Sequence, residues 1–206
     1  MTPVLSREPV VLASGSATRA RLLRDAGVEI LVDRPAVDED EVKQAFRADG
    51  ASPDEAAEAL ADLKARRIAP RHPGRLVLAA DQMLECEGEW FAKPADRAAA
   101  QAQLARLAGR THRLVSAAVV HLDGQRIWHR IEMARMTMRP LGGPFLAAYL
   151  DAAGDAVLGS VGAYHVEGLG AQLFARIEGD HFTIQGLPLL PLLAFLRQRG
   201  VLPKSR

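Results

Sequence analysis

The chain has 206 residues, 49% of them hydrophobic, so it can close a substantial core and is not expected to be disordered. Its 26 basic and 25 acidic residues nearly balance, which argues against a nucleic-acid or membrane-surface binder. The single cysteine, Cys86, excludes an internal disulfide and a cysteine-rich zinc site, and the early apolar run 10–13 is too short for an export signal, so we expect a soluble cytoplasmic protein.

Strands and helices alternate in the first part of the chain. Its predicted elements, in order, are a strand over 10–13, a helix that ends at Gly27, a strand over 28–32, a short helix that ends near Gly50, a helix from Pro53 to about Ile68 and a strand over 75–80. The helix from Pro53 is the most sharply marked, because Ser52 and Glu55 form a capping box around a proline at the first helical position.

The second part of the chain adds a long β-hairpin and further helices. Its predicted elements are a helix over 94–107, strands over 114–122 and 127–138 joined at Asp123-Gly124, a helix through Tyr149, a glycine-punctuated loop over 154–170, a strand over 173–177 and a helix over about 188–199. Early alternation with a central hairpin predicts a mixed α/β sheet flanked by helices.

The segment Ser14-Gly15-Ser16-Ala17-Thr18-Arg19 stands where a strand hands over to a helix. Hydroxyls, a glycine and a cation at a helix N-terminus suit an oxyanion or a phosphate. The segment is neither a Walker loop nor a dinucleotide fingerprint. An N-cap serine followed by surface arginines would explain the same residues without a ligand.

Lysine is rare here: 22 of the 26 basic residues are Arg, and the lysines are Lys43, Lys64, Lys93 and Lys204. Lys64 shares a helical stripe with Ala56, Leu60 and Ile68, so it points where the apolar face points. We expect its ammonium to face a cleft, free of a structural ion pair. The alternative is a snorkelling lysine with a buried stem.

Two carboxylates are candidates for chemistry. Asp81 is expected to end an apolar strand, and Glu39 lies in the acidic segment 38–41. Strand ends collect ligands in open α/β sheets, and a pair of carboxylates can hold Mg²⁺ or Mn²⁺. A turn-forming aspartate and a solvated acidic helix start are the alternatives.

Lys93 directly precedes the helix predicted from Pro94, where the helix dipole disfavours a cation. A bound anion shared with that helix start would remove the conflict. The six histidines lack ligand spacing, so zinc is not expected, and His112, His121, His129 and His181 are expected to make structural hydrogen bonds.

Seven short motifs, in this order and spacing, resemble the Maf (septum formation inhibitor) family of nucleotide pyrophosphatases. They are Leu12-Ala13-Ser14-Gly15-Ser16-Ala17-Thr18-Arg19, Val37-Asp38-Glu39, Leu60-Ala61-Asp62-Leu63-Lys64-Ala65, Ala80-Asp81-Gln82, Lys93-Pro94, Gly109-Arg110-Thr111-His112 and Gly186-Leu187-Pro188-Leu189. The resemblance implies one domain over 1–206 with two lobes and a central cleft, related to the inosine-triphosphate pyrophosphatases and frequently a homodimer. It also implies metal-dependent hydrolysis of a nucleoside triphosphate to the monophosphate and pyrophosphate.

Residue roles follow from the same resemblance. Asp81 matches the family's proton acceptor and Glu39 its other essential acid, and the two would hold the divalent metal. The remaining matches concern the triphosphate: Arg19, Lys64 and Lys93 as cations around it, and Ser14 and Ser16 as phosphate-contacting serines.

Three positions bear on the base. Gln82 and Glu167 look like the branch that acts on 7-methylguanosine triphosphate, whereas Thr18 stands where that branch usually has an aromatic residue. A buried carboxylate at Glu167 would accept from guanine N1–H and its amino group. The alternatives are a broad house-cleaning hydrolase of modified nucleotides and a nucleotide-binding regulator of cell division without turnover.

Overall fold

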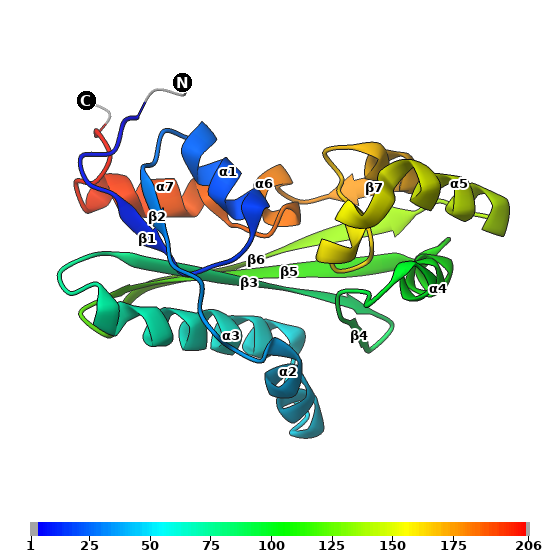
Figure 1. Ribbon diagram of the computed structural model, residues 1–206, viewed down its shortest axis with the longest axis horizontal. Helices are drawn as coiled ribbons and strands as arrows, with labels where there is room; N and C mark the ends of the chain where they lie inside the picture. Colours follow the sequence, from blue (N-terminus) through cyan, green and yellow to red (C-terminus); the bar gives the residue numbers. More distant parts are fainter. Residues whose placement is uncertain (1–3, 205–206) are drawn as a thin grey trace.

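The apolar strands of the chain pair into one seven-stranded mixed sheet. The computed structural model describes residues 4–204, and its strand order is β2-β1-β3-β5-β6-β7, with β4 paired to β3 (Figure 1). The strands are β1 Val10–Leu12, β2 Ile30–Val32, β3 Val77–Cys86, β4 Glu89–Phe91, β5 Thr111–Leu122, β6 Gln125–Met138 and β7 Phe174–Glu178. β1 pairs in parallel with β2 and β3, and all other pairs are antiparallel, so the predicted mixed α/β sheet is confirmed.

Seven α-helices flank this sheet within the described residues. They are α1 Ala17–Asp25, α2 Glu39–Ala48, α3 Pro53–Ile68, α4 Arg97–Leu107, α5 Gly143–Ala153, α6 His181–Ile184 and α7 Leu189–Gln198. The capping box of α3 is present, because the Ser52 hydroxyl accepts from Glu55 N at 3.2 Å and Ser52 N donates to Glu55 Oε2 at 2.8 Å. The short elements β4 and α6 were not predicted.

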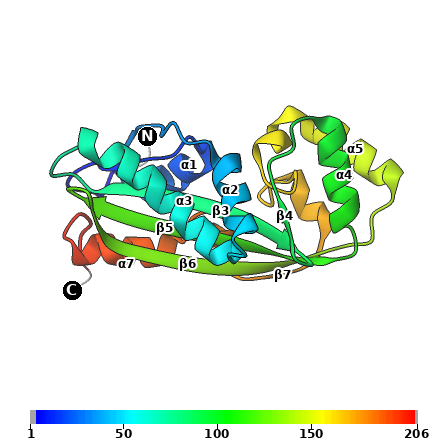
Figure 2. The same ribbon diagram turned by 90° about the horizontal axis from the view of Figure 1, so that it is seen from below.

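Side chains alternate across the sheet and give it two covered faces. Leu12 and Leu78 pack on the side of α1 and α7, whereas Val11 and Val77 pack against α3 on the other side. Farther along, Leu84 of β3 joins a separate core with α4 and α5. Helices α1–α3 and α7 therefore cover one end of the sheet, and α4 and α5 cover the other (Figures 1 and 2).

The central hairpin of β5 and β6 runs through both ends of the sheet, beneath both groups of helices (Figure 2). Asp123 and Gly124 both have positive φ, 48° and 78°, as a two-residue turn between twisted strands requires. This hairpin and its turn confirm the prediction.

Two predictions about local structure are wrong. Asp81 does not end its strand: β3 continues to Cys86 because antiparallel pairing with β5 persists after parallel pairing with β1 stops at Leu78. Helix α4 begins at Arg97, with Asp96 as N-cap accepting from Ala99 N at 2.7 Å. Lys93 is therefore not at a helix start, and the dipole conflict does not exist.

The expected structural roles of four histidines are confirmed. His112 bonds the Tyr164 hydroxyl, and His121 bonds Asp62, both from buried positions on β5. The exposed histidines also make side-chain hydrogen bonds, His129 with Glu58 and His181 with Gln185.

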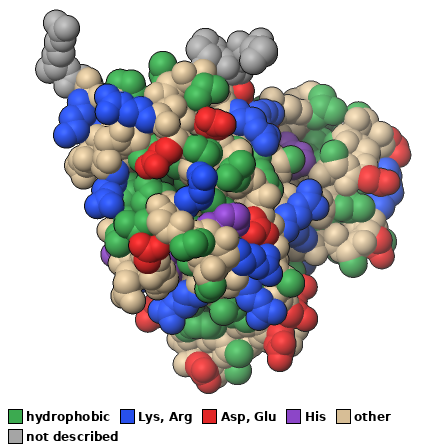
Figure 3. Space-filling view, turned by 60° about the vertical axis from the view of Figure 1, so that its left-hand side comes forward, with side chains coloured by type: hydrophobic (Ala, Val, Ile, Leu, Met, Phe, Trp, Pro, Cys, Tyr) green, Lys and Arg blue, Asp and Glu red, His purple; other side chains and the backbone are tan. Residues whose placement is uncertain are grey.

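No helix within residues 4–204 is long and apolar enough to span a bilayer. On the face drawn in Figure 3, basic and acidic side chains are interspersed.

Candidate active site

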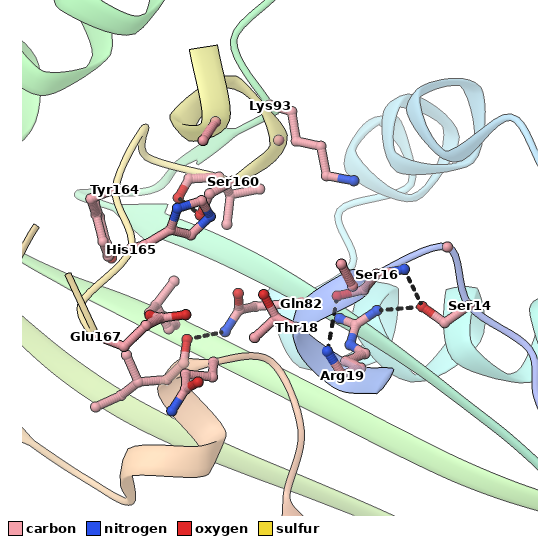
Figure 4. Close-up of a pocket in the computed structure, with 18 of the residues that line it drawn as sticks. Ser14, Ser16, Thr18, Arg19, Gln82, Lys93, Ser160, Tyr164, His165 and Glu167 are labelled. Carbon is pink, nitrogen blue, oxygen red and sulfur yellow. Dashed lines mark hydrogen bonds between the residues drawn. The ribbon is translucent and has the colours of Figure 1, made fainter. Parts of the chain in front are cut away.

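A cleft of about 600 Å³ is lined by residues from both ends of the sheet (Figure 4). It brings together most of the predicted site residues: Ser14, Ser16, Thr18, Arg19, Glu39, Lys64, Gln82, Lys93 and Glu167. Asp81 lies beneath Lys64 and is only 3% exposed. Residues that are far apart in the sequence thus meet at one cavity.

The turn between β1 and α1 forms one side of the cleft. Ser16 is the N-cap of α1, and its hydroxyl accepts from Arg19 N at 3.3 Å, while Ser16 N donates to the Ser14 hydroxyl at 3.2 Å. The first turn of α1 carries no acidic residue, in contrast to α2 and α3. The turn therefore offers hydroxyls and a helix N-terminus with no carboxylate on it to repel an anion.

Arg19 is not the surface arginine of the alternative interpretation. Its side chain is buried, and it donates to Gly186 O at 2.8 Å, Ala80 O at 2.8 Å and the Ser14 hydroxyl at 3.3 Å. Burial lowers the pKa of the guanidinium, opposed by the negative charges of Asp81 and Glu39. Arg19 thus places a fixed positive charge beneath the turn and ties α1 to β3 and to the segment at Gly186.

Lys64 links the two predicted catalytic acids. Its Nζ atom lies 2.5 Å from Asp81 Oδ1 and 2.6 Å from Glu39 Oε1, and its side chain is 4% exposed. The expectation of an ammonium free of ion pairs is wrong, and so is the snorkelling alternative, because the charged end itself is buried. In a low-dielectric site two carboxylates need a cation between them, and Lys64 supplies it.

The electrostatics of the acids follow from this contact. Burial alone would raise the pKa of Glu39, but the charge and hydrogen bond of Lys64, helped by Lys43 and Lys93, lower it. Among residues 4–204, Asp81 Oδ2 is buried and has no hydrogen-bond partner. One oxygen of the Asp81 carboxylate, which lies beneath the cleft-lining Lys64, is therefore without a protein partner.

Gln82 follows Asp81 on β3 and has a fixed amide. Its Nε2 donates to the Ser116 hydroxyl at 3.0 Å, Thr183 O at 3.1 Å and Ile184 O at 3.0 Å. Backbone carbonyls can only accept, so the amide nitrogen must face inward. The carbonyl of Gln82, which lines the cleft, is left to meet a ligand.

Glu167 lies near Gln82 in the cleft, with Thr18 beside them (Figure 4). Its side chain is 23% exposed, and its Oε1 accepts from Arg21 at 3.0 Å, while Arg21 also donates to Gln185 Oε1 at 3.0 Å. The expectation of a buried carboxylate is therefore wrong. Arg21 offsets part of its charge and leaves Oε2 unengaged by that pair.

Several lining residues were not predicted from the sequence. They are Arg34 after β2, Ser160, Tyr164 and His165 from the glycine-punctuated loop, and Gln185 after α6. Arg34 is one arginine among 22, and His165 one histidine among six, without any spacing that sets them apart. Only the density of glycines around the loop hinted that its backbone is unusual.

Comparisons with known proteins find relatives that match this chain over nearly its full length. A protein of Paramagnetospirillum magneticum named nucleoside triphosphate pyrophosphatase is 56% identical over 192 residues, which cover 93% of this chain and 99% of that protein. A protein of the same name from Rhodospirillum rubrum is 50% identical over 194 residues, or 94% of this chain and 96% of its own. By these names the relatives are hydrolases, and the match spans nearly the full length of each.

The family follows from a second comparison. The family profile described as Maf-like protein matches residues 9–199, and the chain belongs to this family. A crystal structure from Mycobacterium abscessus, titled nucleoside-triphosphatase / dITP/XTP pyrophosphatase, covers 94% of this chain and 95% of its own at 15% identity. Its TM-score of 0.42 is too low to support a fold relationship.

Proposed function

We propose that the chain is a nucleoside triphosphate pyrophosphatase that hydrolyses its substrate to the monophosphate and pyrophosphate. The observation that carries the proposal is the cluster formed by buried Asp81 and Lys64 with the partly exposed Glu39, beneath and along a cleft that also contains an anion-suited turn. A pure nucleotide binder would gain nothing from two carboxylates beside an already anionic ligand.

The triphosphate lies, in this proposal, against the β1–α1 turn. The hydroxyls of Ser14 and Ser16 and the N-terminus of α1 contact phosphate oxygens, and Lys93 is exposed at the cleft and free to approach them. Arg19 keeps its bonds to the backbone carbonyls and acts through its fixed charge. These groups neutralise the charge that builds on the pyrophosphate leaving group.

Asp81 accepts the proton of the attacking water in this mechanism. Its Oδ1 is held by Lys64, so the unpartnered Oδ2 is the oxygen that can take a proton. Glu39 shares the same ammonium and keeps Lys64 in place. Attack at the α phosphorus expels pyrophosphate, whereas attack at the β phosphorus expels the monophosphate, and Asp81 accepts the proton of water in either case.

The residues present fit a divalent cation, Mg²⁺ or Mn²⁺. Asp81 and Glu39 already face one shared positive charge, and one carboxylate oxygen at the floor lacks a partner. Residues 4–204 contain no cluster of three or more candidate ligand side chains, so substrate phosphates and water would complete the shell, as is usual for Mg²⁺. When bound, such an ion would polarise phosphate oxygens, and Lys64 could then turn to the phosphates.

The base lies against Gln82 and Glu167, with Thr18 at its side. The Gln82 carbonyl and the Glu167 carboxylate are both acceptors, which favours a base edge with two donors, as guanine has. A positive methylated ring would gain further from the carboxylate. We therefore propose a preference for 7-methylguanosine triphosphate or related modified nucleotides, and a house-cleaning role in the cytoplasm.

The organisation of the protein completes the proposal. We propose that residues 1–206 act as one domain, with the two ends of the sheet as lobes on either side of the cleft. A homodimer is also proposed, to be checked by its mass in solution. No nucleic-acid or membrane partner is proposed.

A turnover panel tests the activity. GTP, 7-methylguanosine triphosphate, UTP and dTTP are each incubated with Mg²⁺ or Mn²⁺, and pyrophosphate and monophosphate are measured separately from phosphate and diphosphate. Asp62→Asn serves as the matched control for Asp81→Asn, because Asp62 is also a largely buried carboxylate but pairs with Arg66 and His121 away from the cleft. Nucleotide binding without release of pyrophosphate would instead support the regulator of cell division.

A further inference from the structure

A buried histidine and a buried tyrosine meet behind the cleft wall formed by residues 160–167. His112 Nε2 lies 2.7 Å from the Tyr164 hydroxyl, and the two side chains belong to residues that are 1% and 4% exposed. Phe174 packs against both rings, with its centroid 5.9 Å from that of His112 and 4.9 Å from that of Tyr164. The mechanism proposed above uses neither His112 nor the Tyr164 hydroxyl.

The backbone of this wall is held in an unfavourable conformation. Ala163 has a φ of 58°, and Gly162, with a φ of 79°, has no room for a side chain, since a Cβ would lie 2.7 Å from Leu84 Cδ1 and from the Tyr164 ring. A non-glycine residue in the left-handed region persists only where its surroundings over-determine it. Interactions with the rest of the protein must therefore stabilise the turn at Gly162 and Ala163.

Two tyrosine hydroxyls hold the turn from its buried side. Tyr149 donates to Ala163 O at 3.1 Å, and Tyr164 bonds His112 one residue later. His112 lies near the start of β5 and is paired with Met136 of β6, so the turn is anchored to the end of the sheet that α4 and α5 cover. The next residues, His165 and Glu167, line the cleft.

The bond joins two neutral groups. Burial lowers the pKa of His112 to about 4 and raises that of Tyr164, so neither is charged near neutral pH. Within the described chain, His112 Nδ1 is buried without a partner, which makes Tyr164 the sole hydrogen-bond partner of the ring there. Losing the hydroxyl would leave the imidazole unsatisfied.

We propose that His112 and the Tyr164 hydroxyl form a positioning pair that fixes the 160–167 wall, and through it the placement of His165 and Glu167 against the base. The proposal rests on the proposed function for the position of the base and for its kinetic readout. The bond between His112 and the Tyr164 hydroxyl lies behind the wall and takes no part in the proposed chemical step, so its loss should act on nucleotide affinity and base discrimination more than on that step.

The test uses variants that remove one interaction at a time. Tyr164→Phe deletes only the hydroxyl, His112→Leu removes the imidazole bond, and His112→Gln retains a donor as a conservative rescue. His121→Leu is the matched control, because His121 also lies on β5, is 1% exposed, has an unpartnered Nδ1 and bonds one group, Asp62, but lies away from the 160–167 wall and does not line the cleft.

Tyr164→Phe and His112→Leu should raise KM about three- to tenfold, bring the kcat/KM values for GTP and UTP closer together, and change kcat less. His112→Gln should recover much of the loss. His121→Leu should lower the melting temperature without changing KM or base discrimination. If His112→Leu and His121→Leu shift only the melting temperature, the positioning role is overturned.

Amide hydrogen exchange of the nucleotide-free protein separates this proposal from the proposed function. Tyr164→Phe should speed exchange over residues 160–168, and His121→Leu should leave that segment as in the parent. Faster exchange supports the pair even if the parent releases no pyrophosphate. Unchanged exchange over 160–168 in Tyr164→Phe would overturn the pair even if the parent is an active pyrophosphatase.

Discussion

The two sides of the cleft are built in different ways. On one side, the β1–α1 turn, Glu39 of α2 and Lys64 of α3 belong to helix starts or helix faces, and charge holds them together. On the other side, residues 160–167 form an irregular turn that hydrogen bonds of neutral buried side chains keep in place. The first side carries the groups suited to phosphate chemistry, and the second carries Glu167, which we proposed to meet the base together with Gln82 of β3.

In the proposed function, this difference separates the groups that act in hydrolysis from the wall that helps to select the nucleotide. A charged cluster at a cleft floor is needed for any triphosphate, whatever its base, and regular elements place it accurately. A loop wall can change its side chains without disturbing that cluster. Changes on the charged side should therefore abolish turnover, whereas changes on the 160–167 side should alter which nucleotide is preferred.

The largest expected effect is that of Asp81→Asn. The change is nearly isosteric but removes the proton acceptor and a negative oxygen, so kcat should fall by roughly 10²- to 10⁴-fold. Steady-state release of pyrophosphate measures it, with Asp62→Asn as the control. Activity within a few-fold of the parent would remove Asp81 from the mechanism.

Lys64→Met should cost stability as well as activity. Without the ammonium, the buried Asp81 loses its ion-pair partner and the partly exposed Glu39 keeps only Lys43, and breaking a buried pair costs up to roughly 3 to 5 kcal/mol. Urea unfolding in the presence of a chelator measures the free energy of unfolding. Lys43→Met is the control, since Lys43 lies 4.0 Å from Glu39 and does not contact Asp81, so an equal loss in both variants would contradict the buried pair.

Acid should weaken the protein partly through His112. Burial lowers its pKa from 6.5 to about 4, so the unfolded chain binds the proton more readily than the folded one. Its neutral burial contributes fully above pH 6.5, and the contribution falls as the pH drops from 6.5 to 4, by at most about 3 kcal/mol. The free energy of unfolding of the parent should fall more steeply over this range than that of His112→Leu, and parallel curves would contradict the assignment.

The smallest expected effect concerns selection alone. Glu167→Gln should lower kcat/KM for 7-methylguanosine triphosphate up to about tenfold relative to UTP, because a neutral amide cannot attract the positive ring. The effect is bounded, since Glu167 is partly exposed and already paired with Arg21. Glu178→Gln, which removes a similar exposed partner of Arg176, is the control, and an unchanged preference would exclude Glu167 from base reading.

The charged side could be predicted from the sequence to a large extent. Hydroxyls and a glycine at a strand-to-helix turn, and a lysine on an apolar helical stripe, are local patterns that survive folding. The contact of Lys64 with Asp81 could not be predicted in this way, because it depends on how α3 packs against a strand that continues past Asp81. The end of a strand depends on the strands that pair with it, and β3 continues past Asp81 because β5 pairs with it there.

The 160–167 wall lay beyond prediction for another reason. Its conformation depends on Tyr149 and His112, which come from an earlier helix and strand, and on the space that Leu84 leaves at Gly162. Nothing in the local sequence specifies such partners. The glycines predict a loop, but its conformation depends on tertiary contacts.

The continuous strands beneath the cleft fix the distance between its two sides. Leu84 of β3, Leu114 of β5 and Met136 of β6 belong to the core under α4 and α5, while the same strands carry Leu78 and Val120 into the core under α1 and α7. The two sides of the cleft therefore cannot swing apart about a flexible linker, since widening the cleft would bend hydrogen-bonded strands. The distance between the β1–α1 turn and the 160–167 wall is set by the number of strand residues between them, with a rise of about 3.3 Å per residue. A fixed spacing of this kind sets the length of ligand that can contact both sides of the cleft at once.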